Sequence, residues 1–237
     1  MSDNTAKQQD SNLHSRLVGA IKKRIIQWEY PPGFRLLEQD ICEKYGVSRS
    51  PAREALRTLE ADGFLDKTPR RGYLIKQPDP SKAREMYEVR LALELFVVEH
   101  LTSKGVPDEK IQALREQWGP TEICASKNNE EFAELDRQFH ETLAAILGNE
   151  TLTNHLASID ERLHVFRTIE FVREETRRTT CAQHLDILAA VASGDVDAAK
   201  KAVSKNIETA LQNVEEVIKE ALVRSYIQTG QGDTWRR

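Results

Sequence analysis

The chain has 237 residues, of which 39% are hydrophobic and 30% are charged, and its formal net charge is −4. This composition is typical of a helix-rich globular protein and argues against a disordered chain. No apolar run approaches the roughly 20 residues that a membrane span needs, and the N-terminal MSDNTAKQQDSN has neither the basic start nor the apolar core of a signal peptide. We therefore expect a cytoplasmic protein with no membrane partner.

The charge is distributed unevenly along the chain. Residues 1–78 contain 14 Lys and Arg against 10 Asp and Glu, whereas residues 79–237 contain 20 against 28. A basic first third joined to an acidic remainder indicates that only the first part meets a polyanion.

Cysteine usage points to no disulfide framework and no zinc ribbon. Cys42, Cys124 and Cys181 are odd in number, far apart and in no CxxC arrangement. We interpret them as small apolar residues of the core.

The first elements of the chain are helical. Residues 1–10 are polar and are predicted to be disordered. Apolar residues at three- and four-residue spacing predict a helix from Leu13 that ends before Pro31, Pro32 and Gly33. A second, short helix is predicted for EQDICEKY, closed by Gly46.

A third helix is predicted within SRSPAREALRTLEADGF, with Ser48 or Ser50 as its cap and Pro51 in its first turn. Its apolar positions turn a row of basic side chains outward at four-residue spacing: Arg49, Arg53 and Arg57. Two short helices joined by a tight glycine turn, the second carrying this row, are typical of a helix-turn-helix.

The following segment, FLDKTPRRGYLIKQP, predicts two short strands around the turn TPRRG, so that Arg70 and Arg71 project from a hairpin wing. Residues 11–78 are therefore predicted to form a winged-helix DNA-binding domain. We expect Arg49 and Arg53 to reach base edges, and Arg57 to contact phosphates together with the wing arginines. The alternative for each arginine is a solvated helix face.

Helical patterns dominate after the linker QPDPSK, residues 77–82. Helices are predicted near 82–103, 107–126, 129–147, 150–169, 172–193 and 195–226. The predicted class is mainly α: an N-terminal winged helix-turn-helix domain and a C-terminal antiparallel helical bundle, residues 79–227, followed by a flexible tail, 228–237.

The motif PPGFRLLEQDICEKYGVSRSPAREALRTLEADGFL resembles the DNA-binding signature of the GntR family of bacterial transcription regulators. The later motifs VRLALE, DRQFH, LGN and QHLDIL resemble its FadR-type subgroup, which carries an all-helical, FCD-like effector domain. Six bundle helices, rather than seven, are similar to the vanillate-regulator-like branch. The resemblance covers nearly the whole chain and implies a homodimer on a palindromic operator, with a small-molecule effector that changes DNA affinity.

The resemblance also implies roles for individual residues. Ser48, Arg49 and Arg53 match the family's recognition-helix contacts, and Gly72 matches the wing glycine that approaches the minor groove. Gln39 departs from the pattern, because some members carry a DNA-contacting arginine there.

A polar pair lies in the apolar stretch ELDRQFH. Asp136 and His140 are one helical turn apart on the flank of an apolar face, so both side chains can point into the bundle. His184 lies on the inward side of a later helix and adds a third group. A buried carboxylate needs a partner or a metal. A satisfied histidine of the core is the alternative for each imidazole, and we interpret His155 and His164 as surface or structural residues.

Many FadR-type members bind a divalent metal through an aspartate, a histidine one turn later and two later histidines. The resemblance therefore implies that Asp136, His140 and His184 are metal ligands for Zn, Ni or Mn. Asn206 stands where the fourth ligand, a histidine, is expected. An amide oxygen is a harder ligand than an imidazole, which favours manganese or magnesium by comparison. The alternative is a metal-free pocket in which His140, His184 and Asn206 hydrogen-bond the effector.

Arg90 in VRLALE is a further candidate for the effector site. If it faces the bundle interior, it can clamp a carboxylate of the effector. The alternative is a helix-stabilising pair with Glu94, one turn later.

The sequence thus favours a ligand-responsive transcription regulator, not an enzyme, whose effector is an organic acid or a related metabolite. Two other functions stay open at this point. One is a metal-dependent enzyme fused to a DNA-binding domain, and the other is an architectural DNA binder that senses nothing.

Overall fold

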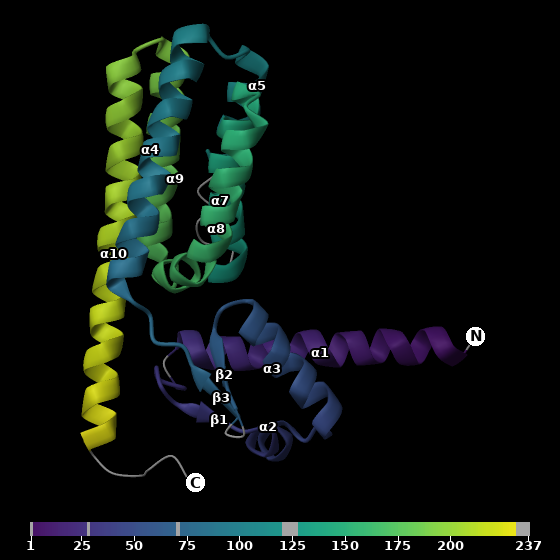
Figure 1. Cartoon of the computed structure of the whole chain (residues 1–237). Helices are drawn as coiled ribbons and strands as arrows, with labels where there is room; N and C mark the ends of the chain where they lie inside the picture. The colour runs from purple at the N-terminus through teal and green to yellow at the C-terminus, as the bar shows by residue number, and fades with distance from the viewer. Residues whose placement is uncertain (1, 28, 70–71, 120–127, 231–237) are drawn as a thin grey trace. The chain divides into compact units, whose positions relative to one another are not determined.

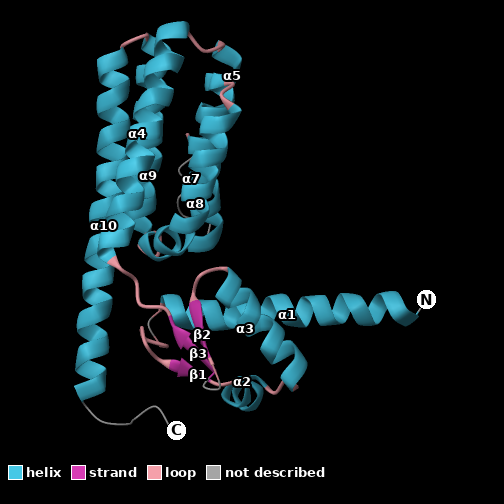
Figure 2. Cartoon of the chain, in the orientation of Figure 1, coloured by secondary structure: helices cyan, strands magenta, loops and turns pink. Residues whose placement is uncertain are grey.

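The computed structural model describes residues 2–27, 29–69, 72–119 and 128–230. Its contacts divide the chain into two compact units, Met1–Pro78 with Ile218–Arg237, and Asp79–Val217. Helices make up most of the described residues, and the described strands all belong to the first unit (Figures 1 and 2). The predicted mainly α class, with a winged helix-turn-helix before a helical bundle, is confirmed.

Among its described residues, the first unit contains three helices, a small sheet and, from Ile218 onward, the end of a fourth helix. The helices are α1 (Ser2–Ile26), α2 (Glu38–Tyr45) and α3 (Arg49–Ala61), and the strands are β1 (Arg35–Leu36), β2 (Leu65–Thr68) and β3 (Gly72–Ile75). The helices present apolar residues to one core, among them Ile21, Ile41, Ala55, Leu56 and Leu59, all fully buried. α1 begins at Ser2, within the segment 1–10 for which the sequence predicts disorder, because Ala, Lys and Gln there have good helix propensity.

The turn between α2 and α3 has the predicted form. Gly46 adopts the left-handed conformation with φ of 64° and donates its amide N–H to the Cys42 carbonyl oxygen. Ser48 occupies the N-cap position of α3 with extended backbone, although its side chain makes no capping hydrogen bond. The helix-turn-helix is therefore held by the glycine turn and by the buried face of α3.

The wing is the antiparallel pair β2 and β3, with Leu65 opposite Ile75 and Thr68 opposite Gly72. Arg70 and Arg71, at its predicted tip, lie outside the described residues. β1 was not expected from the sequence because two residues give no periodicity. It pairs with the other edge of β3, which gives the order β1-β3-β2.

Gly72 is explained by this third strand. Its φ is 80°, and a Cβ atom there would lie 2.6 Å from the Leu36 carbonyl oxygen and 2.8 Å from Leu37 Cδ2. No side chain fits at this position without moving the backbone of β1. The fold therefore requires glycine here independently of any contact with DNA.

The second unit is a bundle in which the helices lie side by side (Figure 1). The described helices are α4 (Pro80–Lys104), α5 (Asp108–Trp118), α7 (Asn129–Leu147), α8 (Glu150–Glu170), α9 (Glu174–Ser193) and α10 (Val196–Gly230). Their ends follow the predicted turn signals closely. Asn128 accepts the amide protons of Glu130 and Glu131 at the start of α7, and Gly148 and Gly194 close α7 and α9 in the left-handed conformation.

Two expectations about this unit differ from the structure. The helix predicted over 107–126 ends at Trp118, before Gly119 and Pro120 of the sequence, which disfavour its continuation; residues 120–127 lie outside the described part of the chain. Cys181 is disulfide-bonded, whereas we expected reduced apolar cysteines, and Cys42 is free. Sequence spacing alone does not show which cysteines approach each other in space.

α10 continues to Gly230, past the predicted domain end at residue 227. Among the described residues, no helix is both long enough and apolar enough to cross a membrane.

Candidate functional site

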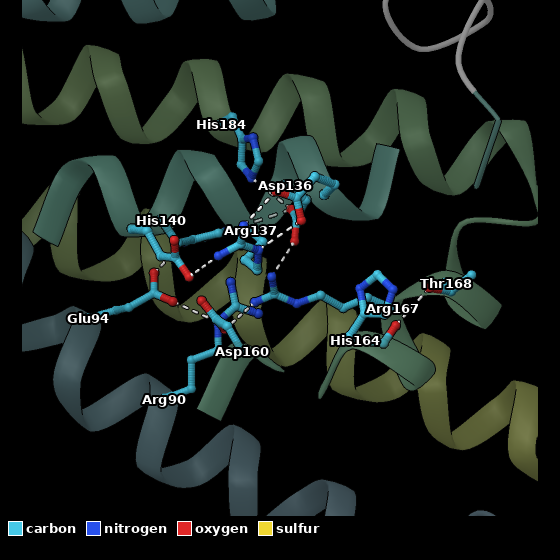
Figure 3. Close-up of polar contacts among 12 residues, drawn as sticks. Arg90, Glu94, Asp136, Arg137, His140, Asp160, His164, Arg167, Thr168 and His184 are labelled. Atoms are coloured by element: carbon cyan, nitrogen blue, oxygen red, sulfur yellow. Dashed lines mark hydrogen bonds and ion pairs between the residues drawn. The ribbon is translucent and has the colours of Figure 1, made fainter. Parts of the chain in front are cut away.

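The core of the bundle contains a group of charged side chains (Figure 3). Asp136 and His140 extend from one face of α7, and His184 reaches them from α9. Their exposed fractions are 4%, 1% and 0%. One ligand atom from each of the three lies within 4.8 Å of the others, so the structure brings the three predicted ligands together.

Both imidazoles direct Nε2 at the same carboxylate oxygen. His184 Nε2 lies 3.2 Å and His140 Nε2 lies 3.8 Å from Asp136 Oδ1. Neither nitrogen has a partner with hydrogen-bond geometry. Buried nitrogens of this kind normally have a partner, so the three side chains could hold an ion or a small polar molecule.

Glu94 of α4 fixes the orientation of His140. Its Oε2 lies 2.5 Å from His140 Nδ1, which leaves Nε2 for the site. A carboxylate behind a metal-binding imidazole orients the ring and increases its basicity. The sequence suggested Glu94 only as a partner of Arg90.

Aromatic side chains hold His184 in place. Its ring stacks on Phe139 with centroids 3.8 Å apart, and it meets the edge of Trp118 at 4.2 Å. Trp118, the last residue of α5, also packs edge-on against Phe132 and Phe139. The site therefore has an apolar wall on this side, which restricts ring rotation and excludes water.

The electrostatics favour an ionised Asp136 and a neutral His184. Burial opposes ionisation of Asp136, but the Arg167 guanidinium and the two imidazoles outweigh it and hold the carboxyl pKa well below its usual range. Burial lowers the pKa of His184 to about 4, against the opposing effect of Asp136. A carboxylate and a neutral imidazole are the protonation states that a metal ion requires.

Glu94 and His140 form a charged pair. Burial acts against ionisation of Glu94, but His140 and Arg90 lower its pKa to about 2. Burial likewise opposes the charged form of His140, yet the adjacent Glu94 raises the pKa of the imidazole. For His140 Nε2 to hold a metal ion, this pair would therefore have to lose a proton.

Two buried arginines complete the group. Arg90 Nε donates to Glu94 Oε1 at 2.7 Å and lies 3.6 Å from Asp160 Oδ1. Arg167 of α8 donates from Nη2 to Asp160 Oδ1 at 2.6 Å, and its Nη1 lies 3.3 Å from Asp136 Oδ2. Arg90 thus faces the interior and also pairs with Glu94, so the two interpretations of this residue are not exclusive.

Asn206 has a different partner from the one the resemblance suggests. It is buried, and its Nδ2 donates to Gln183 Oε1 at 3.0 Å. Gln183 immediately precedes His184 in the sequence. The Gln183 amide in turn donates to Thr209 Oγ1. His155 is exposed, and His164 is half-buried with its backbone carbonyl accepting from Thr168.

In the first unit, α3 presents a row of exposed arginines, as predicted: Arg49, Arg53 and Arg57. Arg53 is not free, because its guanidinium donates to both carboxylate oxygens of Glu38 on α2, at 2.9 Å each. These hydrogen bonds from Arg53, together with the nearby charges of Arg49 and Arg57, lower the pKa of the Glu38 carboxyl. The pair fixes the direction of Arg53 before any DNA contact.

Comparison with known proteins gives two family matches that together span most of the chain. Residues 13–75 match the bacterial regulatory proteins of the gntR family, and residues 85–209 match the FCD domain. The Nta operon transcriptional regulator of Aminobacter aminovorans is 31% identical over 205 residues, which cover 85% of this chain and 94% of that protein. The HTH-type transcriptional regulator YdhC of Bacillus subtilis (strain 168) is 30% identical, over 84% of this chain and 90% of its own length.

The chain belongs to the GntR family, with an FCD domain. Solved structures of similar fold agree. A GntR transcriptional regulator from Rhodococcus sp. RHA1 has a TM-score of 0.57 at 21% identity, over 86% of this chain and 97% of that one. Escherichia coli McbR/YncC has a TM-score of 0.56 at 18% identity, over 88% and 98%. This GntR protein is therefore a transcription regulator and not an enzyme, and the metal-dependent enzyme considered above is set aside.

The burial of several charged residues in this FCD domain was not predicted, although the sequence contains a signal for it. In α8, Asp160, Arg167 and Glu170 occur at helical spacing on the same stripe as Leu156 and Leu163. Charged residues on an apolar stripe are costly to bury singly, so three of them on one stripe indicate a buried ionic group.

Proposed function

We propose that this GntR regulator binds operator DNA as a homodimer through α3 and the β2–β3 wing, and that its FCD domain senses a small carboxylate at a divalent metal. The proposed metal ligands are Asp136, His140 and His184. When bound, the ion would supply a Lewis acid that attracts the oxygen atoms of the effector.

The observation that carries the metal part is the pair of unsatisfied Nε2 atoms directed at Asp136 Oδ1. The donor set, one carboxylate and two imidazoles, suits Mn, Ni or Zn. Glu94 provides the carboxylate behind one imidazole that metal sites commonly have. A metal-free pocket, with His140, His184 and Asn206 bonded to the effector, is the second candidate, because Asn206 of α10 is buried and its amide donates to Gln183, which precedes His184 on α9.

The DNA part rests on the exposed basic face of α3. Arg49 and Arg53 are proposed to contact base edges, with Arg57 and the wing arginines Arg70 and Arg71 on phosphates. Ser48 and Gly72 are proposed contacts as well, in addition to the structural reason for Gly72 given above. The Arg53–Glu38 pair supports a specific role for Arg53, since a guanidinium held by two hydrogen bonds keeps one direction.

Ligand sensing requires that the effector bind the two states of the regulator with different affinity. Fluorescence anisotropy with the regulator's own upstream DNA tests the DNA-binding part of the proposal. We expect Arg49→Ala and Arg53→Ala each to weaken specific binding by about tenfold or more, because a bidentate base contact contributes about 1–3 kcal/mol. Lys76→Ala, at an exposed basic position of the same unit, is the matched control. If both arginine variants bound the DNA with wild-type affinity, α3 would not be the recognition helix.

A further inference from the structure

The row of arginines on α3 includes one that is paired with an acidic side chain. Arg53 donates from Nε to Glu38 Oε1 and from Nη2 to Glu38 Oε2, at 2.9 Å each. Arg49 and Arg57, one turn before and one turn after it, make no hydrogen bond with any residue that the structure describes. A carboxylate repels DNA phosphates, so its place within a basic row that is proposed to meet DNA calls for an explanation.

The pair joins two helices whose positions are fixed by buried side chains. Glu38 is the first residue of α2, and Ile41, one turn later, is fully buried. On α3, Ala52 and Leu56 are fully buried on either side of Arg53 in the sequence. The paired side chains themselves are 50% and 31% exposed. An ion pair this exposed contributes little to stability, so stability alone does not account for it.

The helix dipole does not account for the geometry of the pair either. A carboxylate in the first turn of a helix offsets the partial positive charge of the N-terminus. Asp40 lies in the same first turn of α2 and provides this charge as well. Two positions along a helix change the direction of the side chain, so Asp40 and Glu38 point to different sides of α2. Stabilisation of the dipole requires only a charge, whereas the contact of Glu38 with two guanidinium nitrogens fixes a direction.

The geometry of the pair leaves one edge of the Arg53 guanidinium free. Glu38 accepts from Nε and Nη2, so Nη1 and the second N–H of Nη2 remain as two parallel donors on the other edge. In the major groove, guanine presents two acceptors, N7 and O6, which match such an edge. Adenine presents one acceptor and one donor there, and a guanidinium cannot accept a hydrogen bond.

We propose that Glu38 is a positioning residue for base recognition: it holds Arg53 by one edge so that the other edge reads a guanine of the operator. This inference rests on the proposed role of α3 as the recognition helix and names the base that one of its arginines reads. Glu38 weakens the attraction to DNA of any sequence, and it also keeps Arg53 from turning toward a phosphate. Its contribution is therefore to discrimination between sequences and not to affinity.

The first test compares affinities for two duplexes by fluorescence anisotropy at several salt concentrations. One duplex is the site that the wild-type protein selects from random-sequence DNA, and the other is an unrelated duplex of equal length. Glu38→Gln keeps the size of the side chain but loses the charge and one acceptor, so we expect the ratio of the two affinities to fall about tenfold or more. On the unrelated duplex, the slope of log K against log salt should steepen by about one per chain, because Arg53 becomes free to contact a phosphate.

The control for the lost charge is Asp40→Asn, in the same turn of α2. Both variants remove one negative charge from the N-terminus of this helix, but only Glu38→Gln removes the partner of Arg53. Asp40→Asn should therefore keep the wild-type affinity ratio. Thermal unfolding of each variant, with a midpoint close to that of wild type, shows that the first unit remains folded.

A double-mutant cycle tests whether Glu38 acts through Arg53. Arg53→Lys keeps the positive charge but has no pair of parallel donors, so it should lose the discrimination that Glu38→Gln loses. In the Arg53→Lys background, Glu38→Gln should not reduce the affinity ratio further. A general structural role of Glu38 would instead give losses that add.

The identity of the base is tested by modified guanines in the selected site. 7-Deazaguanine lacks the N7 acceptor, and at one position in each half-site it should weaken the wild-type protein about tenfold and leave Arg53→Lys unaffected. Inosine keeps N7 and O6 and is the matched control. If 7-deazaguanine has the same effect on both proteins at every guanine, Arg53 does not read guanine.

The outcomes separate this inference from the function on which it rests. An unchanged affinity ratio in Glu38→Gln, or additive losses in the cycle, overturns the positioning role. The recognition helix then stands as long as Arg49→Ala weakens DNA binding. If neither Arg49→Ala nor Arg53→Ala changes the affinity for DNA, the recognition helix and the positioning role of Glu38 are both overturned.

Discussion

At the residue scale, the site depends on which nitrogen of each histidine is free. The one-turn spacing of Asp136 and His140 predicted their common face, and the inward position of His184 predicted that it could join them. The contact of Glu94 with His140 Nδ1 could not be predicted, because the two residues are 46 positions apart in the sequence and lie on different helices. Helical periodicity states which way a side chain points, but not which partner it meets across the bundle.

Glu94 should therefore act on metal binding without being a ligand. Glu94→Gln keeps the shape of the side chain but removes the charge behind His140, so we expect manganese affinity to fall by about tenfold or more. Titration of chelator-treated protein measures this. The control is Glu99→Gln, which lies on α4 like Glu94 and removes an exposed carboxylate that pairs with Lys200. Equal affinities in wild type and Glu94→Gln would mean that His140 needs no such support.

Asn206 is the second residue whose role can be tested directly. Asn206→His replaces an amide bonded to Gln183 with the imidazole that the family pattern leads one to expect at this position. We expect nickel and zinc affinity to rise by about tenfold or more, because a further imidazole adds a ligand these ions prefer. Asn154→His, at an exposed position of α8, controls for nonspecific binding to an added histidine. Unchanged affinity would place Asn206 outside the site.

At the element scale, the sequence predicted most helices well and the short elements less well. The bounds of α7 coincide with the prediction because Asn128 and Gly148 are strong signals on both ends. β1 was missed because two residues carry no pattern, and α5 was predicted too long across Gly119 and Pro120. The charged residues of α8 were not predicted to be buried, because a charged residue is usually exposed and the stripe becomes evident only when Asp160, Arg167 and Glu170 are considered together.

Glu170 on that stripe predicts a pH dependence of the free energy of unfolding. Burial raises its carboxyl pKa from the ordinary 4.5 to about 8, so the folded protein keeps a proton that the unfolded chain loses between these values. The free energy of unfolding then falls as pH rises through this window, by up to about 1.4 kcal/mol per pH unit. Below about pH 4.5 the carboxyl is protonated in both states, so this slope disappears.

Glu170→Gln lacks the ionisable group and should lack this component. Urea unfolding of metal-free wild type and variant at several pH values measures the difference. We expect the stability of the variant relative to wild type to increase steadily from about pH 5 to pH 8. A difference that does not change with pH would show that Glu170 is ionised in the folded protein.

At the scale of the whole molecule, the charge distribution and the motifs predicted a basic DNA-binding domain followed by an acidic helical bundle. The predicted domain limits and the homodimer stay predictions. The sequence could not show that the polar bundle residues form one connected group, because Arg90, Asp136, Asp160, Arg167 and His184 come from four helices and meet only in the fold.

The most direct measurement is the metal content of the untagged protein, purified without chelators and dialysed against manganese, by plasma mass spectrometry. Wild type should retain about one divalent ion per chain, and His184→Asn should lose it, because one of three protein ligands is removed. His155→Asn, which changes an exposed histidine, should retain the ion. A metal-free wild type, or equal metal content in wild type and His184→Asn, would contradict a metal centre at Asp136, His140 and His184.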